Sequence, residues 1–490
     1  MLKKRTAVLL MVAAMICGSL LTFFLSSGNS YAGQAVGGEG LLASITNSAG
    51  LKKEEAQKIG TALDLIEGNY YKDIDRSTLV DGAINGMMQS LSDPYSTYMG
   101  QETAQQFEES IEGSFSGIGA EVSLKEGNVT VVSPIKGSPA EKAGIRSQDI
   151  LLSVNGESLD GLELNVAVSK IRGVKGTTAK VKVKREGVAD PIEFAIVRDD
   201  VDLETVNARM EKNGVGVIEI TQFSLNTGDR FKAELSKLEK QGMKGLVIDV
   251  RNNPGGVLSV VIDIAQQFVS KGELIVQVED KEGKREKSLS KGSSKSYPIT
   301  LLMNKGSASA SEILAGALQE SAGVILMGEN SFGKGTVQTS FDKQLGDGSL
   351  LKITIAKWLT PKGTWIHEKG IKPDIAVSQP PFFSVAPINK EKSLQYNTNN
   401  EDVKSAQVML NGLGFKPGRT DGYFDQGTEK SVKRFQTSQK LKENGIIDAK
   451  TAGALEYELI KHIQDPQNDT QLKQGIAEVQ KEIKALASKK

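Results

Sequence analysis

The apolar positions of this 490-residue chain repeat with different periods in successive segments. An uncharged, mostly apolar run covers residues 6–25, and helical spacing of apolar residues follows in residues 59–66 and 80–91. From residue 114 the pattern changes to short alternating runs separated by turn-forming residues, as in β-strands. Strand and helix patterns alternate from residue 216 onward, and more helical patterns follow residue 400. This length and patterning predict three or more domains.

The stretch from residue 299 to residue 338 holds the main candidate chemistry. An apolar run ends at Met303, a Ser/Ala alternation covers residues 307–311, and apolar residues then recur at helical spacing to Leu318. Ser309 is therefore predicted to lie where a strand turns into a helix. The free N–H groups of a helix's first turn stabilise negative charge, which suits a nucleophilic serine. The alternative is that these serines only cap the helix.

A serine nucleophile also needs a base. The chain has two histidines, and the one near this stretch, His367, lies among turn-forming residues. Lys334 is better placed, between Gly333 and Gly335, with Gln338 four positions on, where it could orient the amine. A lysine acts as a base only when neutral, so burial has to lower its pKa from about 10.4 to about 7, at roughly 4–5 kcal/mol. Lys334 is the preferred base and His367 the alternative.

These motifs together resemble the active site of the carboxyl-terminal processing peptidases, also called tail-specific proteases. The resemblance extends to residues 245–256, 360–361 and 370–374, and covers most of residues 50–380. It implies an α/β serine protease core of crotonase-like fold, without a metal or a cofactor. The implied roles are nucleophile for Ser309, general base for Lys334 and support for Gln338. The backbone N–H groups of Gly255, Gly256 and Ala310 are implied to bind the oxyanion, and the alternative for the two glycines is a plain strand-to-helix turn.

The short strands of residues 114–198 resemble a PDZ domain. Their turns lie at Ser116-Gly117-Ile118-Gly119, at residues 137–140 and at residues 155–156, and a short helix follows near residues 165–172. In this module a peptide adds as a strand, and loop N–H groups capture its free carboxy terminus. The resemblance maps that loop to Ser116, Gly117, Ile118 and Gly119. Arg172 is expected to be solvated, and the alternative is that it contacts the peptide or the protease.

Residues 1–33 are predicted to be a targeting segment. Three basic residues precede the apolar run, and Ser30-Tyr31-Ala32 offers a small-residue cleavage site, so both a cleaved signal peptide and a membrane anchor fit. The rest of the chain is then exported. The only cysteine, Cys17, lies inside the run, which excludes disulfides elsewhere. Lys plus Arg and Asp plus Glu number 60 each, which argues against a nucleic-acid partner.

The carboxy-terminal region contains an internal repeat in which Asp425 and Asp448 are each predicted to start a helix. It resembles the three-helix peptidoglycan-binding domain, and the alternative is a general helical interaction module. The final segment carries apolar residues at spacings of four and three from Leu472 to Leu486, which predicts an apolar stripe that packs against another helix.

The sequence therefore predicts a multidomain α+β protein. The predicted segments are a signal peptide or anchor (1–33), a spacer and N-terminal helical region that caps the protease or builds a homodimer (34–113), a PDZ domain (114–198), the protease core (199–379), a linker (380–400), the peptidoglycan-binding-like domain (401–465) and a helical tail (466–490). The predicted function is that of an exported serine endopeptidase, anchored or secreted near the cell wall. Its expected partners are proteins or peptides with free C-termini, and peptidoglycan. The alternative is a catalytically silent scaffold.

Overall fold

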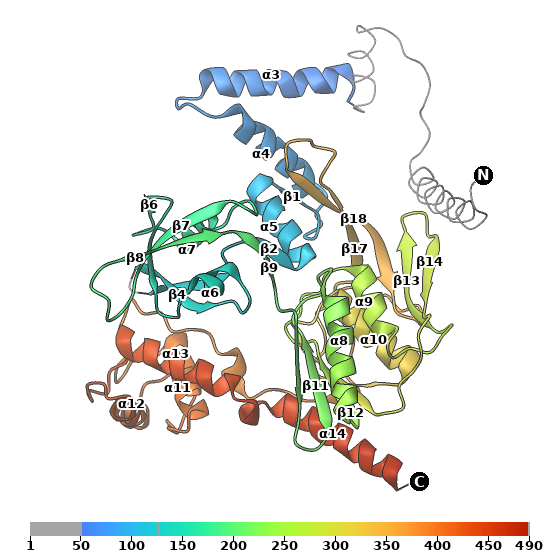
Figure 1. The fold of residues 1–490 in the computed structure, drawn as a ribbon, viewed down its shortest axis with the longest axis vertical. Helices are drawn as coiled ribbons and strands as arrows, with labels where there is room; N and C mark the ends of the chain where they lie inside the picture. Colours follow the sequence, from blue (N-terminus) through green and yellow to red (C-terminus); the bar gives the residue numbers. More distant parts are fainter. Residues whose placement is uncertain (1–50, 126, 489–490) are drawn as a thin grey trace, which may run out of the picture. The chain divides into compact units, whose positions relative to one another are not determined.

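The structure, a computed structural model, describes residues 51–125 and 127–488 (Figure 1). The predicted targeting segment and the predicted spacer, residues 34–50, lie outside these residues. The chain divides into two compact units, residues 1–84 and 85–490, and each is considered by itself. None of the helices in the described ranges has the length and apolar content needed to cross a bilayer.

The described part of the first unit is helical, as the spacing of its apolar residues predicts. It contains α3 (Lys53–Asn69) and the beginning of α4 (Arg76–Gln89). Helix α3 has no buried residue, and Ile59, Leu65 and Ile66 on it are all exposed. In the second unit, β1 (Thr97–Met99) and α5 (Gln101–Glu112) lead into the next domain.

The predicted PDZ domain is a six-stranded antiparallel sheet with two helices. Its strands, in the order β3-β4-β5-β7-β8 with β6 beside β5, are β3 (Ala120–Lys125), β4 (Asn128–Pro134), β5 (Ile150–Val154), β6 (Glu157–Ser158), β7 (Thr178–Lys184) and β8 (Ile192–Val197). Helices α6 (Pro139–Ala143) and α7 (Leu164–Ile171) complete it. Asn155 and Gly156 both have positive φ and form the predicted tight turn between β5 and β6. Where the chain enters and leaves, β2 (Ser114–Gly117) pairs with β9 (Asp199–Asp202).

The predicted protease core is built on a second six-stranded sheet. Its strands, in spatial order, are β10 (Val206–Met210), β11 (Val215–Ile220), β12 (Gly245–Asp249), β15 (Ile299–Met303), β16 (Ile325–Gly328) and β19 (Ile375–Ala376), all parallel except β10. Alternate residues along a strand face opposite sides. Leu301 and Met303 pack in the cluster that includes α8 (Thr227–Lys240), α9 (Leu258–Ala265) and α10 (Ala310–Ala322), whereas Leu302 between them faces the other side.

That other side is covered by α14 (Thr470–Ala487), the predicted helical tail (Figure 1). Leu472 and Val479 pack with Val247 and Leu302 of the sheet, and Gly475 lies so close that an added Cβ would stand 2.9 Å from a Leu302 methyl group. The prediction that this apolar stripe packs against another helix is wrong. The stripe packs against a face of the sheet that would otherwise be uncovered.

A second, antiparallel sheet completes the core. It contains β13 (Leu274–Asp280), β14 (Arg285–Leu289), β17 (Thr336–Phe341) and β18 (Leu350–Leu359), and β1 pairs with β18 at its edge. Strand β17 begins directly after the Gly-Lys-Gly motif, so this sheet carries the loop of the predicted base.

The carboxy-terminal domain has three helices around one apolar core. They are α11 (Glu401–Gly412), α12 (Gln426–Ser438) and α13 (Ala449–Gln464), and the short 3-10 helices η1 (Pro381–Ser384) and η2 (Pro466–Asn468) flank them. Asp425 and Asp448 cap α12 and α13, as predicted. The predicted linker is partly packed, because Ile388 and Leu394 are buried in this core.

Candidate active site

Ser309 is the accessible member of the serine alternation. It lies at the N-cap position of α10 with φ 54° and ψ −112°, a strained conformation for a residue other than glycine. The flanking serines are buried and hold the loop after β12: Ser307 Oγ donates to the Val250 carbonyl at 2.8 Å, and Ser311 Oγ donates to the Asn253 carbonyl at 2.9 Å. Ser309 is half-buried, so it is the serine of the three that a substrate can reach.

One buried carboxylate binds the backbone of both predicted catalytic residues. Glu312, fully buried in α10, accepts hydrogen bonds on Oε2 from the N–H groups of Ser309 and Lys334, both at 2.8 Å. Its Oε1 accepts from the Gly333 N–H at 2.7 Å and from Ser331 Oγ at 2.6 Å. The sequence reasoning gave Glu312 no role. The spacing Ser309-x-x-Glu312, which is that of a capping box, was the signal that could have found it.

The Lys334 amine lies against an aromatic ring. Its Nζ is 5.0 Å from the centre of the Tyr95 ring, within the range of a cation–π contact. Its backbone carbonyl accepts a hydrogen bond from Trp358 Nε1 at 2.8 Å, which fixes the loop on β18. Within the described residues, no hydrogen bond joins Lys334 Nζ to Ser309 Oγ. The two segments are brought together, but the amine points to Tyr95.

The surroundings of Lys334 favour its neutral form. Burial is the main reason that its pKa is lowered, and the positive charge of Lys352 adds to this effect. The carboxylates of Asp93 and Glu312 oppose the shift without cancelling it. The direction is the one that a lysine base requires.

Among the described residues, no hydrogen bond joins Gln338 to the Lys334 amine. Gln338 Nε2 donates to the hydroxyls of Thr336 at 2.9 Å and Thr354 at 3.0 Å. The prediction from four-residue spacing assumed a regular element, but Lys334 precedes β17, and the pairing of β17 with β18 shifts register between Val337 and Gln338.

His367, the alternative base, supports the lysine loop instead. Its Nδ1 accepts a hydrogen bond from the Gly335 N–H at 3.2 Å, and its ring stacks on Trp365 with 5.1 Å between ring centres. A neutral imidazole that accepts on Nδ1 carries its proton on Nε2. His367 therefore has no free lone pair for a serine hydroxyl in this arrangement.

The three predicted oxyanion donors differ in availability. The Gly255 N–H already donates to Asn253 Oδ1 at 2.9 Å. Gly255 instead provides space, since an added Cβ would stand 2.8 Å from the Ser309 Cβ. Within the described part of the chain, the Gly256 and Ala310 N–H groups donate to no acceptor. These two N–H groups are therefore the ones open to a substrate oxygen.

The predicted peptide-binding loop borders a small cavity in the PDZ domain. Ile118 and Gly119 line it, together with Val168 and Ile171 among others, and its volume is about 70 Å³. Ser116 and Gly117 lie instead in β2, paired with β9. The Ser116 hydroxyl is buried and has no hydrogen-bond partner in residues 51–125 and 127–488.

Arg172 is not simply solvated, as the sequence suggested. It lines the same cavity, pairs with Glu109 of α5, and stacks over Phe115 at 4.8 Å from the ring centre. The PDZ domain is thus tied to α5 through a residue that lines its own cavity.

No group of three or more His, Cys, Asp or Glu side chains in the described ranges is arranged to hold a metal ion.

Protein-family models match four stretches of the chain. The model for peptidase family S41 matches residues 214–377, and a PDZ domain model matches residues 130–185. The N-terminal domain of the activating protease CtpB matches residues 18–103, and a putative peptidoglycan binding domain matches residues 399–455.

Full-length relatives agree with these matches. The carboxy-terminal processing protease CtpB of Bacillus subtilis is 46% identical over 88% of this chain and 90% of its own length. CtpA of the same organism is 43% identical over 96% of this chain and 97% of its own length. Among solved structures, the photosystem II D1 C-terminal processing protease is 28% identical, with 67% of this chain and 94% of that chain covered and a TM-score of 0.40. The chain therefore belongs to the carboxy-terminal processing proteases of peptidase family S41 and is a peptidase with a PDZ domain and a peptidoglycan-binding domain.

Proposed function

We propose that this peptidase is an exported serine endopeptidase that cleaves proteins near their carboxy termini, with Ser309 as nucleophile and Lys334 as base. The observation that carries the proposal is the carboxylate of Glu312. Because the N–H groups of Ser309 and Lys334 each lie 2.8 Å from the same oxygen, their nitrogens are at most twice that distance apart. The flexible four-carbon stem of a lysine spans such a separation.

In the proposed reaction, the Lys334 side chain turns from Tyr95 toward Ser309 and accepts the hydroxyl proton. Ser309 Oγ attacks the peptide carbonyl, and the N–H groups of Gly256 and Ala310 bind the oxyanion. The leaving amine takes the proton from Lys334, and the acyl-enzyme is hydrolysed by a water that Lys334 deprotonates. Gln338 is proposed to orient the amine after it turns.

The PDZ domain is proposed to select or admit the substrate. Strand β3 is at the edge of its sheet, so a peptide can add to it as a further strand beside α7. The carboxy terminus would then enter the cavity at Ile118 and Gly119, with an apolar last side chain against Val168. Because Arg172 lines that cavity and pairs with Glu109, a bound peptide would disturb the contact between the PDZ domain and α5.

Two further parts of the proposal concern location and assembly. The peptidoglycan-binding domain is proposed to hold the enzyme at the cell wall. Helix α3 is proposed to build a homodimer, because it leaves large apolar side chains exposed, with Leu65 at 59% and Tyr71 just beyond the helix at 78%.

The proteolytic function is tested with an unstructured protein that ends in apolar residues. Fragments are identified by mass spectrometry after incubation with the wild type and with Ser309→Ala. We expect cleavage near the carboxy terminus by the wild type alone. Equal turnover by both would refute the assignment, and no turnover by either would favour the silent scaffold.

Wall binding is tested by sedimentation with purified peptidoglycan. The comparison is a chain in which residues 386–465 are replaced by a flexible Gly/Ser linker, which keeps α14. We expect the replacement to abolish sedimentation, and unchanged sedimentation would contradict the role given to this domain.

A further inference from the structure

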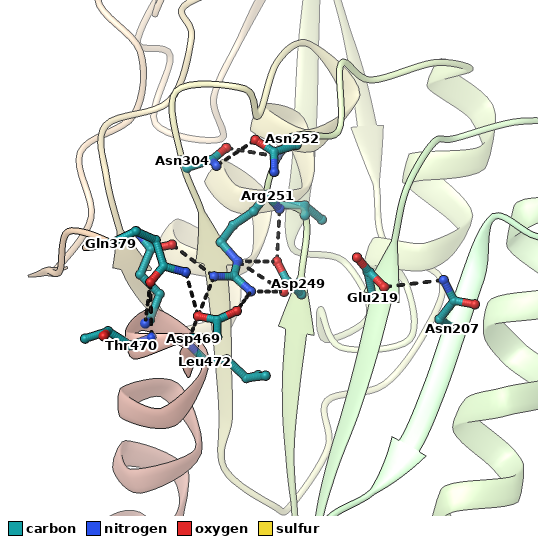
Figure 2. Close-up of polar contacts among 12 residues, drawn as sticks. Asn207, Glu219, Asp249, Arg251, Asn252, Asn304, Gln379, Asp469, Thr470 and Leu472 are labelled. Atoms are coloured by element: carbon teal, nitrogen blue, oxygen red, sulfur yellow. Dashed lines mark hydrogen bonds and ion pairs between the residues drawn. The ribbon is translucent and has the colours of Figure 1, made fainter. Parts of the chain in front are cut away.

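A buried ion cluster joins the end of β12 to the start of the carboxy-terminal helix (Figure 2). The Arg251 guanidinium lies between two carboxylates: Nη2 is 2.6 Å from Asp249 Oδ2 and 2.7 Å from Asp469 Oδ2. All three side chains are at most 12% exposed. Both carboxylates are bound by two nitrogens of the guanidinium, the geometry in which arginine binds most specifically.

The cluster is fixed from the side of α14. Asp469 is the N-cap of this helix, and its Oδ1 accepts from the Leu472 N–H at 2.8 Å and from Gln379 Nε2 at 2.6 Å. Gln471 Oε1 accepts from Arg251 Nη1 at 3.0 Å. Since α14 packs along the sheet, the position of Asp469 is set by a layer of the core that follows the peptidoglycan-binding domain in sequence.

On its other side the cluster borders the loop that presents the oxyanion donors. Arg251 begins that loop, and Asn252, the next residue, has φ 57° and exchanges hydrogen bonds with Asn304 at 2.9 and 2.8 Å. Asn253 then accepts bonds on its carbonyl from the Ala308 N–H at 3.0 Å and from Ser311 Oγ at 2.9 Å. The loop of residues 251–256 thus lies directly between the cluster and the nucleophile segment.

We propose that Arg251 is a positioning residue for the oxyanion loop and that Asp469 holds it in place, which makes α14 part of the active-site scaffold. The inference rests on the proposed function only for its effect on catalysis. Within the loop, Asn252 is a non-glycine residue at positive φ, and Gly255 and Gly256 adopt positive φ that other residues rarely adopt, so the shape of the loop depends on the contacts that anchor its ends.

The decisive variant is Asp469→Asn. Asparagine caps helices as well as aspartate does. Its carbonyl can keep the bonds that Oδ1 makes to Leu472 and Gln379, but its NH₂ group then faces Arg251 Nη2, donor against donor. The variant therefore replaces the contact of Arg251 Nη2 with Asp469 Oδ2 by a donor–donor contact, while the Nη1 bond to Oδ1 and the helix start are preserved. The matched control is Asp465→Asn, which changes an exposed aspartate capping η2 four residues earlier.

Steady-state kinetics on the unstructured substrate separate positioning from general stability. We expect Asp469→Asn to lower kcat about tenfold with KM unchanged, because displacement by about 1 Å in a catalytic site can lower the rate by about a hundredfold. The Asp465→Asn control is expected to match the wild type. Wild-type kcat in a folded Asp469→Asn protein would overturn the inference, while the inactivity of Ser309→Ala would still support the proposed function.

Hydrogen–deuterium exchange tests the same inference without any activity. We expect amides of residues 251–256 and 307–311 to exchange faster in Asp469→Asn than in the wild type, and amides of the PDZ domain to be unchanged. If the amides of both loops exchange at the same rate in Asp469→Asn and in the wild type, the inference is overturned, even if the chain cleaves no substrate. A uniform increase over the whole chain would do the same, since it would indicate general destabilisation.

Discussion

Replacing Glu312 with glutamine changes one oxygen of the carboxylate that holds both catalytic segments. A carboxylate accepts at both oxygens, whereas an amide has one acceptor and one NH₂ donor. The amide can take two orientations. In the first, its NH₂ group replaces Oε2 and faces two N–H donors, those of Ser309 and Lys334. In the second, the NH₂ group replaces Oε1 and faces the Gly333 N–H and the Ser331 hydroxyl. Of these two groups, the hydroxyl can rotate and accept a hydrogen bond. The second orientation is therefore expected, and it leaves the Gly333 N–H unpaired.

The magnitude follows from that unpaired donor. A buried N–H without a partner costs about 1–3 kcal/mol, and the remaining bonds lose the strengthening that the charge supplies. We expect Glu312→Gln to lower the free energy of unfolding by about 2–3 kcal/mol. Turnover should fall at least tenfold, because Gly333 directly precedes the base and its release lets the lysine loop move.

The assay is urea unfolding of the purified chain together with kcat on an unstructured protein. The control is Glu320→Gln, on the same helix, where a single bond from the Lys362 N–H at 2.7 Å can be kept by the amide carbonyl. This control should stay within about 0.5 kcal/mol of the wild type. If Glu312→Gln is as stable and as active as Glu320→Gln, the shared carboxylate does not organise the site.

Other predictions address the base, the oxyanion loop and the PDZ contact. Lys352→Met removes a charge that lowers the pKa of Lys334, so the rise of kcat/KM with pH should move to higher pH; an unmoved profile would contradict a lysine base. Gly255→Ala should abolish turnover, since its Cβ would collide with the nucleophile's Cβ, whereas Gly272→Ala, also at positive φ but facing open space, should stay active. Arg172→Ala should change the dependence of turnover on the substrate's carboxy-terminal residues, and identical selectivity for a series of peptides would exclude its role at the cavity.

Where local pattern and fold agree, the sequence was sufficient. The apolar run of β15 and the helical spacing after it place Ser309 at the strand-to-helix junction, because each element shows its own pattern of apolar residues. The same holds for Asp425 and Asp448, whose helices start at them. The Asn155-Gly156 turn was predicted for the same reason, since few backbone conformations suit that pair.

What depends on long-range contacts could not be predicted. The apolar stripe of α14 has the same spacing whether it packs against a helix or a sheet. Which of the two it meets depends on distant apolar residues of the sheet, such as Leu302, that face this side of the core. The link between Glu312 and Lys334 crosses 22 positions. The direction of the Lys334 side chain depends on Tyr95, which precedes the PDZ domain in the sequence. No local period contains that information.

The central claim, that an amine rather than an imidazole activates Ser309, is tested most directly by comparing Lys334→Met with His367→Gln in single-turnover cleavage. Both variants must first show the unfolding profile of the wild type. If Lys334 is the base, we expect no cleavage by Lys334→Met and substantial cleavage by His367→Gln, whose amide oxygen can still accept from the Gly335 N–H. Cleavage by Lys334→Met together with its loss in His367→Gln would show that an imidazole activates Ser309 instead.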